Sequence, residues 1–178
     1  MKPKIKIIGA GPAGIFAAYS LAQEKKFDIE IIDQGKDVEK RVCAQERGKK
    51  CVNCQPCNIH QGFGGAGTMS DGKLNFDIRI GNNLNEITLP QTNRQLTQEV
   101  ENFFISYGIT PIKTHQEFLS DLEKKALQNN IEFLGVKHAH IGSENLRELM
   151  KKIKRDLTNN GVTITTEKQI QELNLNVS

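Results

Sequence analysis

Residues 9–14 read Gly-Ala-Gly-Pro-Ala-Gly, and this short stretch decides the fold class of the chain. An apolar run at residues 5–8 precedes it, and a segment rich in small residues follows at residues 15–22. These neighbours predict a short buried strand, a glycine turn and a helix. A second apolar run at residues 29–32 ends at Asp33. A GxGxxG motif in this setting is typical of a dinucleotide-binding βαβ unit.

Each position of the motif has a physical task. Gly9 permits the tight turn, Gly11 lets the backbone approach a pyrophosphate, and Gly14 lets the helix pack closely on the sheet. The helix N-terminus offers N–H groups and a partial positive charge to phosphates, and Pro12 suits its first turn. Asp33 is expected to accept hydrogen bonds from a ribose 2′-hydroxyl, which NAD and the adenosine of FAD carry and NADP lacks. A glycine turn in an ordinary α/β domain is the alternative.

Composition and charge bound the class of protein. The chain has 178 residues, of which 37% are hydrophobic, and a net charge of +3 from 24 basic and 21 acidic residues. This length predicts one domain or slightly more, and so mild a charge does not indicate a nucleic-acid partner. No apolar stretch is long enough to span a bilayer, and the N-terminus lacks the pattern of a signal peptide. We therefore expect a cytoplasmic protein that acts on a small molecule, with no nucleic-acid or membrane partner.

The remaining pattern predicts an α/β fold in which a parallel Rossmann-like sheet is interrupted by an α+β excursion. Helices are expected at residues 93–107, 116–129 and 143–160, and strands at residues 131–136 and 162–166. The last strand is expected to return to the parallel sheet by a right-handed crossover. The predicted parts are 1–76 (dinucleotide-binding unit with a cysteine-bearing insertion and a glycine-rich loop), 77–142 (inserted substrate-domain-like segment) and 143–178 (returning helix and strand).

All four cysteines lie within a short stretch of the chain. Cys43, Cys51, Cys54 and Cys57 follow the spacing C-x7-C-x2-C-x2-C. In a cytosolic protein, clustered thiols are more often metal ligands or redox groups than structural disulfides. The spacing predicts one metal centre, either zinc or an iron–sulfur cluster, and His60 is a possible substitute ligand. A pair of redox thiols and cysteines without a role are the alternatives that remain open.

Two further stretches carry a resemblance to a known family. Residues 64–74 read Gly-Gly-Ala-Gly-Thr-Met-Ser-Asp-Gly-Lys-Leu, and residues 140–147 read His-Ile-Gly-Ser-Glu-Asn-Leu-Arg. Together with residues 9–14 they resemble the bacterial NAD(P)/FAD-dependent oxidoreductases often labelled uncharacterised FAD-dependent dehydrogenases. The resemblance extends from Ile5 to about Leu173. It implies a glutathione-reductase-like FAD fold, FAD as cofactor and NAD(P)H as an optional electron donor.

The resemblance also implies a set of cofactor-binding residues. They are Gly9, Gly11, Pro12, Ala13, Gly14, Asp33, Gln34, Arg41, Gly64, Gly65, Ser70 and Ile170. No catalytic residue is assigned, because in a flavoenzyme the cofactor carries the chemistry.

One departure from the family concerns the ribitol of FAD. Members of the family continue to a later strand that ends in a Gly-Asp pair, whose acid holds the ribitol. This sequence contains no Gly-Asp pair. We therefore expect the N-terminal, FAD-binding portion of an oxidoreductase, which is not competent by itself and whose C-terminal half is on a separate chain or a longer one. The alternative is a truncated, non-catalytic remnant that binds a nucleotide or a metal.

Overall fold

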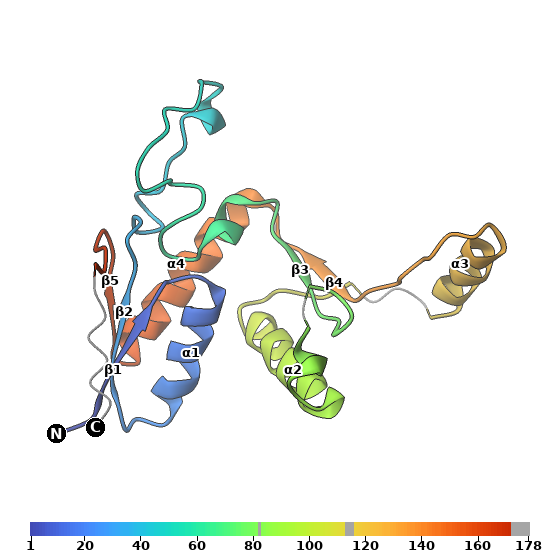
Figure 1. Cartoon of the computed structure of the whole chain (residues 1–178), viewed down its shortest axis with the longest axis horizontal. Helices are drawn as coiled ribbons and strands as arrows, with labels where there is room; N and C mark the ends of the chain where they lie inside the picture. Colours follow the sequence, from blue (N-terminus) through green and yellow to red (C-terminus); the bar gives the residue numbers. More distant parts are fainter. Residues whose placement is uncertain (82, 113–115, 172–178) are drawn as a thin grey trace. The chain divides into compact units, whose positions relative to one another are not determined.

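The computed structural model describes residues 1–81, 83–112 and 116–171, with the backbone alone for 116–118 (Figure 1). The chain divides into two compact units. The first unit comprises Met1–Gly72 and Ser143–Ser178, and the second unit comprises Lys73–Gly142. The second unit is therefore inserted, in sequence, between the two halves of the first.

A parallel three-stranded sheet forms the centre of the first unit. Its strands are β1 (Lys4–Ile8), β2 (Asp28–Ile32) and β5 (Val162–Thr165), in the order β1-β2-β5. Helix α1 (Pro12–Gln23) connects β1 to β2, and helix α4 (Ser143–Asn159) leads into β5. This arrangement confirms the predicted Rossmann-like α/β class, including the return of the last strand to the parallel sheet.

The two faces of this sheet differ in polarity. Helices α1 and α4 lie side by side on one face, where they cover the apolar rows of the strands (Figure 1). The buried stripe of α4 consists of Leu146, Leu149, Met150, Ile153 and Leu157. Burial of each such side chain stabilises the fold by about 1.5–3 kcal/mol. The opposite face carries a polar row in which Lys6, Glu30 and Thr163 are paired across the three strands.

The segments that follow the three strands meet at the carboxyl edge of the sheet. The Gly9 N–H donates to the Ile32 carbonyl, and the Asp33 N–H donates to the Thr165 carbonyl. The Lys168 N–H in turn donates to the Asp33 carbonyl. In parallel α/β sheets this edge is where ligands bind.

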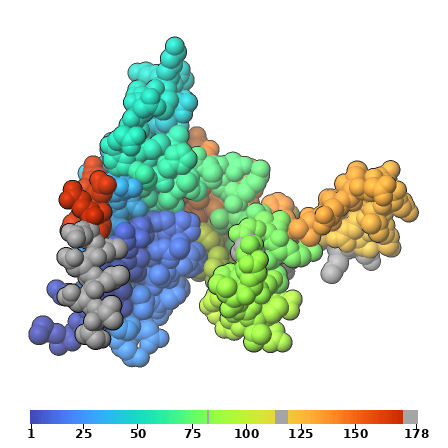
Figure 2. Space-filling view, viewed as in Figure 1, coloured from blue at the N-terminus to red at the C-terminus, as the bar shows by residue number. Residues whose placement is uncertain are grey.

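The segment after β2 leaves the sheet and carries the cysteines. Residues 45–53 are exposed throughout and include a short 3-10 turn at Gln45–Arg47. Figure 2 shows this segment, in cyan, projecting beyond the rest of the first unit. From Cys54 onward the chain turns back, and Asn58 is buried again.

In its described residues, the second unit contains two α-helices, a two-stranded antiparallel sheet and a short 3-10 turn at Leu84–Glu86. Helices α2 (Pro90–Ser106) and α3 (Gln116–Gln128) confirm two predicted helices. Strand β3 (Lys73–Asn75) pairs with β4 (His138–His140). The buried aromatic rings of this unit include Phe76, Phe103 and Phe104, with the centroids of the last two 5.4 Å apart.

The prediction of a strand at residues 131–136 is wrong. These residues have no regular structure, and the strand lies further along, at His138–His140. The apolar side chains that suggested a strand remain largely exposed, with Ile131 60% and Phe133 38% accessible. Their pattern is that of a buried strand, but strand formation needs a partner, and β3 pairs with the histidine segment instead.

No helix in the described part of the chain combines the length and apolar character that crossing a membrane requires.

Candidate functional site

A cavity of about 320 Å³ opens at the carboxyl edge of the parallel sheet. It lies entirely within the first unit. Its lining residues are Ile8, Gly9, Gly11, Ile32, Asp33, Gln34, His60, Gln61, Gly62, Gly65, Lys168, Gln169 and Ile170. Its volume is near the lower end of the range for small-molecule sites. The cavity joins four segments distant in sequence: the first glycine loop, the end of β2, the loop around residue 62 and the segment after β5.

The first glycine loop presents an open helix N-terminus to this cavity. Gly9 has a φ of +101°, a conformation that L side chains rarely adopt. Gly11 is the N-cap of α1 and supplies no side-chain cap. A Cβ added at Gly11 would meet no atom within 4 Å, so the space beside this residue is open. The first N–H groups of a helix have no partner within the helix, which makes this end suited to phosphate.

Gly14 has a different function, which is packing. A Cβ at this position would lie 2.0 Å from the Gly9 carbonyl oxygen, a backbone atom of the glycine loop. Helix α1 therefore approaches the loop more closely than any side chain would allow. This contact agrees with the close helix packing expected of the third glycine of the motif.

We predict that Gly14→Ala destabilises the fold by about 1–3 kcal/mol, the usual cost of overpacking. Alanine by itself stabilises a helix by about 1 kcal/mol relative to glycine. A net loss of folding free energy would therefore come from the clash with Gly9. The free energy of unfolding in urea measures the effect. Gly67→Ala is the matched control, because Gly67 is exposed and a Cβ there meets no atom within 4 Å. A Gly14→Ala variant as stable as this control would contradict the prediction.

Asp33 lies at the end of β2 and ties two loops together. Its Oδ2 accepts the Ala10 N–H at 2.8 Å, and its Oδ1 accepts the Gly35 N–H at 2.7 Å. Asp33 also lines the cavity. A carboxylate has about four acceptor positions, so two remain for a ligand. The structure thus shows a bridging role for Asp33 that the sequence did not suggest, beside the ribose contact that stays a prediction.

The second glycine-rich loop packs directly on the first. The Gly64 N–H donates to the Ala10 carbonyl at 2.8 Å. A Cβ at Gly65 would lie 3.1 Å from the Gly11 Cα, and Gly65 has a φ of +66°. The resemblance placed Gly64 and Gly65 near the cofactor, and Gly65 indeed lines the cavity beside Gly11. Gly64 does not line the cavity, but its hydrogen bond to Ala10 links the two glycine loops.

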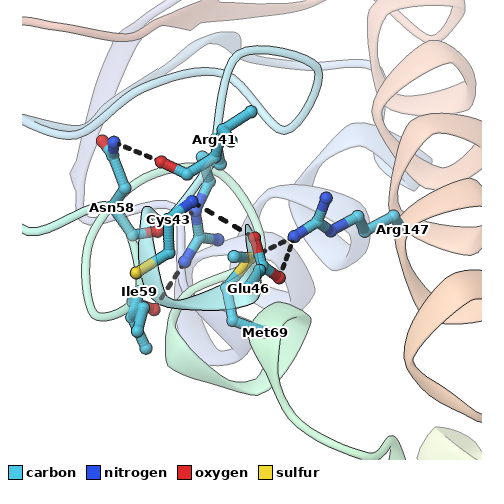
Figure 3. A network of polar contacts seen from close by, with 8 residues as sticks. Arg41, Cys43, Glu46, Asn58, Ile59, Met69 and Arg147 are labelled. Carbon is cyan, nitrogen blue, oxygen red and sulfur yellow. Dashed lines mark hydrogen bonds and ion pairs between the residues drawn. The ribbon is translucent and has the colours of Figure 1, made fainter. Parts of the chain in front are cut away.

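The buried side chain of Arg41 fixes the second glycine-rich loop through hydrogen bonds (Figure 3). Its side chain is only 1% exposed, and its guanidinium donates to four backbone carbonyls. The acceptors are the carbonyls of Asn58, Ile59, Phe63 and Gly65, at 2.7–2.9 Å. Burial lowers the pKa of Arg41 below its ordinary value, and the negative charge of Asp33 opposes this change. The structure gives Arg41 a scaffolding function, with its donors directed at the loop.

A second polar contact joins the cysteine-bearing segment to α4 (Figure 3). The Glu46 carboxylate accepts the Cys43 N–H and forms an ion pair with Arg147, whose guanidinium also contacts the Met69 sulfur. Burial by itself would raise the pKa of Glu46, but the hydrogen bonds from Cys43 and Arg147 lower it below the ordinary value. This contact anchors the base of the exposed segment.

The four cysteines do not fit one metal centre in this arrangement. Among the described residues, no three His, Cys, Asp or Glu side chains lie close enough together to hold a metal ion. Cys43 is buried, whereas Cys51 is exposed and its thiol is turned to Asn53. Only Cys54 and Cys57 meet, through a hydrogen bond between their sulfurs. The spacing C-x2-C-x2-C allows convergence, but the fold of the segment separates the side chains. The predicted zinc or iron–sulfur site is therefore not found among the described residues.

The structure brings together half of the predicted cofactor-binding residues. Those that line the cavity are Gly9, Gly11, Asp33, Gln34, Gly65 and Ile170. The other six residues do not line the cavity but belong to the segments around it. They are Pro12, Ala13 and Gly14 in the first turn of α1, Gly64 and Ser70 in the second glycine-rich loop, and Arg41, which is hydrogen-bonded to that loop. The Ser70 hydroxyl donates to the Gly67 carbonyl, which folds that loop.

Sequence reasoning missed several cavity residues. His60, Gln61 and Gly62 precede the Gly64-Gly65 pair, and Lys168 and Gln169 precede Ile170. The one feature of the sequence that could have indicated them is that they stand next to predicted residues along the chain. Their position in the wall depends on hydrogen bonds distant in sequence, such as that between the Phe63 N–H and the Lys36 carbonyl.

Comparisons with known proteins agree with this geometry. Over 81 residues the chain is 41% identical to an uncharacterized protein of Clostridium beijerinckii. The aligned part is 44% of this chain and 15% of that protein, so the chain matches only a small fraction of the length of that relative. Residues 7–47, from β1 through the glycine loop and β2 to the base of the cysteine-bearing segment, match the family described as NAD(P)-binding Rossmann-like domain. The chain thus carries a Rossmann-like dinucleotide-binding domain.

Proposed function

We propose that the cavity binds FAD and that the chain is the FAD-binding portion of a flavin-dependent oxidoreductase. The observation that carries the proposal is the cavity itself, where an uncapped helix N-terminus, an acid at the end of β2 and a second glycine loop face one space. The open space beside Gly11 suits the close approach of a pyrophosphate. When bound, FAD would supply the redox chemistry.

The residues of the chain have separate tasks in this proposal. Gly11 and the first turn of α1 would hold the pyrophosphate, and the two acceptor positions left on Asp33 would take the ribose hydroxyls. Ile170 and Gln34, which both line the cavity, would contact the adenosine end. An NAD(P)H electron donor, the inserted segment as a substrate domain and a C-terminal half on another chain remain proposals.

A comparison of the affinities for four nucleotides tests the proposal. The purified chain, freed of bound ligand, is titrated separately with FAD, FMN, NAD⁺ and NADP⁺. We expect FAD to bind most tightly and NADP⁺ most weakly, because Asp33 would face the 2′-phosphate of NADP⁺ and repel it. FMN lacks the adenosine half, so it should bind less tightly than FAD. Preference for NAD⁺ over FAD would assign the site to a nicotinamide cofactor instead, and no binding of any of the four would refute the proposed function.

The ribose contact of Asp33 has a test of its own. In the unmodified chain, ADP should bind more tightly than 2′-deoxy-ADP by about tenfold or more, as expected for hydrogen bonds to a charged group. In Asp33→Ala this preference should vanish. The ratio of the two affinities is the informative quantity, since the loss of the loop contacts of Asp33 weakens both ligands alike. A preference that persists in Asp33→Ala would show that the carboxylate only bridges the loops.

A further inference from the structure

Cys54 and Cys57 form a close thiol pair in the returning part of the cysteine-bearing segment. Two residues separate them, and the Cys54 thiol hydrogen-bonds to the Cys57 sulfur. Both side chains are half-buried, so they remain accessible from solvent. This pair is the part of the cysteine cluster that the fold brings together.

The surroundings of the Cys57 sulfur are built to hold a negative charge. The backbone N–H groups of His60 and Ile59 both donate to this sulfur. The chain also closes a turn here, because the Gln61 N–H donates to the Cys57 carbonyl at 2.9 Å. Three donors, the N–H groups of His60 and Ile59 and the Cys54 thiol, therefore converge on one sulfur atom.

Arg41 explains why both N–H groups point at the sulfur. Its guanidinium binds the carbonyls of Asn58 and Ile59, at 2.9 and 2.7 Å (Figure 3). In a planar trans peptide, the N–H points opposite to the carbonyl of the same peptide unit. The two N–H groups that belong to these units are those of Ile59 and His60. The buried guanidinium therefore fixes two consecutive peptides with their N–H groups directed away from it, toward Cys57.

We propose that Cys54 and Cys57 are a redox dithiol that reduces low-molecular-weight disulfides, with Cys57 as the attacking nucleophile and Cys54 as the resolving thiol. The thiolate is the reactive form of cysteine, and backbone N–H groups stabilise it. This inference goes beyond the proposed function and does not depend on FAD.

The exchange proceeds in two balanced steps. The Cys57 thiolate attacks one sulfur of the disulfide, forms a mixed disulfide and expels the first thiolate, which takes a proton from water. The Cys54 thiol then loses its proton to water and attacks the Cys57 sulfur, which forms the Cys54–Cys57 disulfide and expels the second thiolate. Two electrons pass from the protein dithiol to the small disulfide, which leaves as two thiols.

The other two cysteines provide an internal comparison. Cys43 is buried, and Cys51 is more exposed than Cys57. The Cys51 sulfur accepts only the Asn53 N–H, at 3.5 Å. If exposure controlled reactivity, Cys51 would react first. If the hydrogen-bond donors around the sulfur control reactivity, Cys57 reacts first.

The test uses the reduced chain and glutathione disulfide, with alkylation at successive times and mass mapping of each cysteine. In Cys54→Ser, the mixed disulfide should accumulate at Cys57 at least about threefold faster than at Cys51 of the same molecule. The donors at the Cys57 sulfur increase its thiolate fraction, and the accompanying loss of intrinsic nucleophilicity is smaller than this gain, so a net preference of about threefold is expected. In urea, which abolishes the fold, this ratio should fall to about one.

Two further variants complete the design. The unmodified chain should form the Cys54–Cys57 disulfide and release two equivalents of glutathione. Cys51→Ser should give the same product at the same rate, since this cysteine takes no part. Faster reaction at Cys51 than at Cys57, or a disulfide that joins Cys51 to either partner in the unmodified chain, would overturn the proposal.

Discussion

Replacing Gly11 by valine is expected to lower the affinity for FAD by about 100-fold or more, or roughly 3 kcal/mol, the upper range for overpacking a tight contact. Gly11 lines the cavity, and its φ of −76° is one that valine adopts readily. A side chain there meets no atom of the chain within 4 Å of its Cβ, so it would occupy the space reserved for the ligand. Fluorescence titration of FAD measures the loss.

Two measurements separate this effect from unfolding. The thermal midpoint of Gly11→Val should stay close to that of the unmodified chain, in contrast to Gly14→Ala. Gly67→Val is the matched control, because Gly67 is an exposed glycine of the second loop that lies outside the cavity. Equal retention of FAD by both valine variants would show that the ligand does not approach Gly11.

Arg41→Met is expected to destabilise the first unit by about 4 kcal/mol. Methionine keeps most of the aliphatic volume but leaves four carbonyls without their donor, at about 1 kcal/mol or more for each. The free energy of unfolding in urea measures the change. Arg47→Met is the control, since Arg47 is an exposed arginine of the same segment.

The outcome for Arg41→Met also shows whether the second loop folds together with the sheet. A loss of stability comparable to the estimate means that the loop and the sheet unfold as one cooperative unit. A midpoint equal to that of Arg47→Met would contradict the prediction, and the loop would then be an independent feature that Arg41 stabilises only locally.

The sequence predicted those parts of the site that depend on neighbours along the chain. The strand, turn and helix around Gly11 follow from local pattern, and so does the place of Asp33 at the end of the next strand. The buried stripe of α4 and the return to β5 were equally readable, because a helical period and a β-branched run identify them.

The parts that escaped prediction depend on contacts between distant residues. Nothing in the local sequence shows that Arg41 is buried beneath residues 58–65, since arginine is usually exposed. The cysteine spacing was correctly seen as unusual, yet spacing gives no direction for a side chain. Direction is set by the turn at Cys57, which Arg41 holds in place. The spacing therefore could not indicate that the four side chains diverge.

The late return of β5 has a consequence for the order of folding during synthesis. Ile29 of β2 pairs with Val162 of β5, so the third strand joins the sheet only after the whole second unit has left the ribosome. Lys168 and Ile170, which close the cavity, are made later still. The nascent chain therefore exposes one edge of β2 until β5 has been made, and an unpaired edge invites association. A ligand can therefore bind in the complete cavity only after residue 170 has been made, and a chaperone that shields the edge of β2 until then would raise the yield of folded protein.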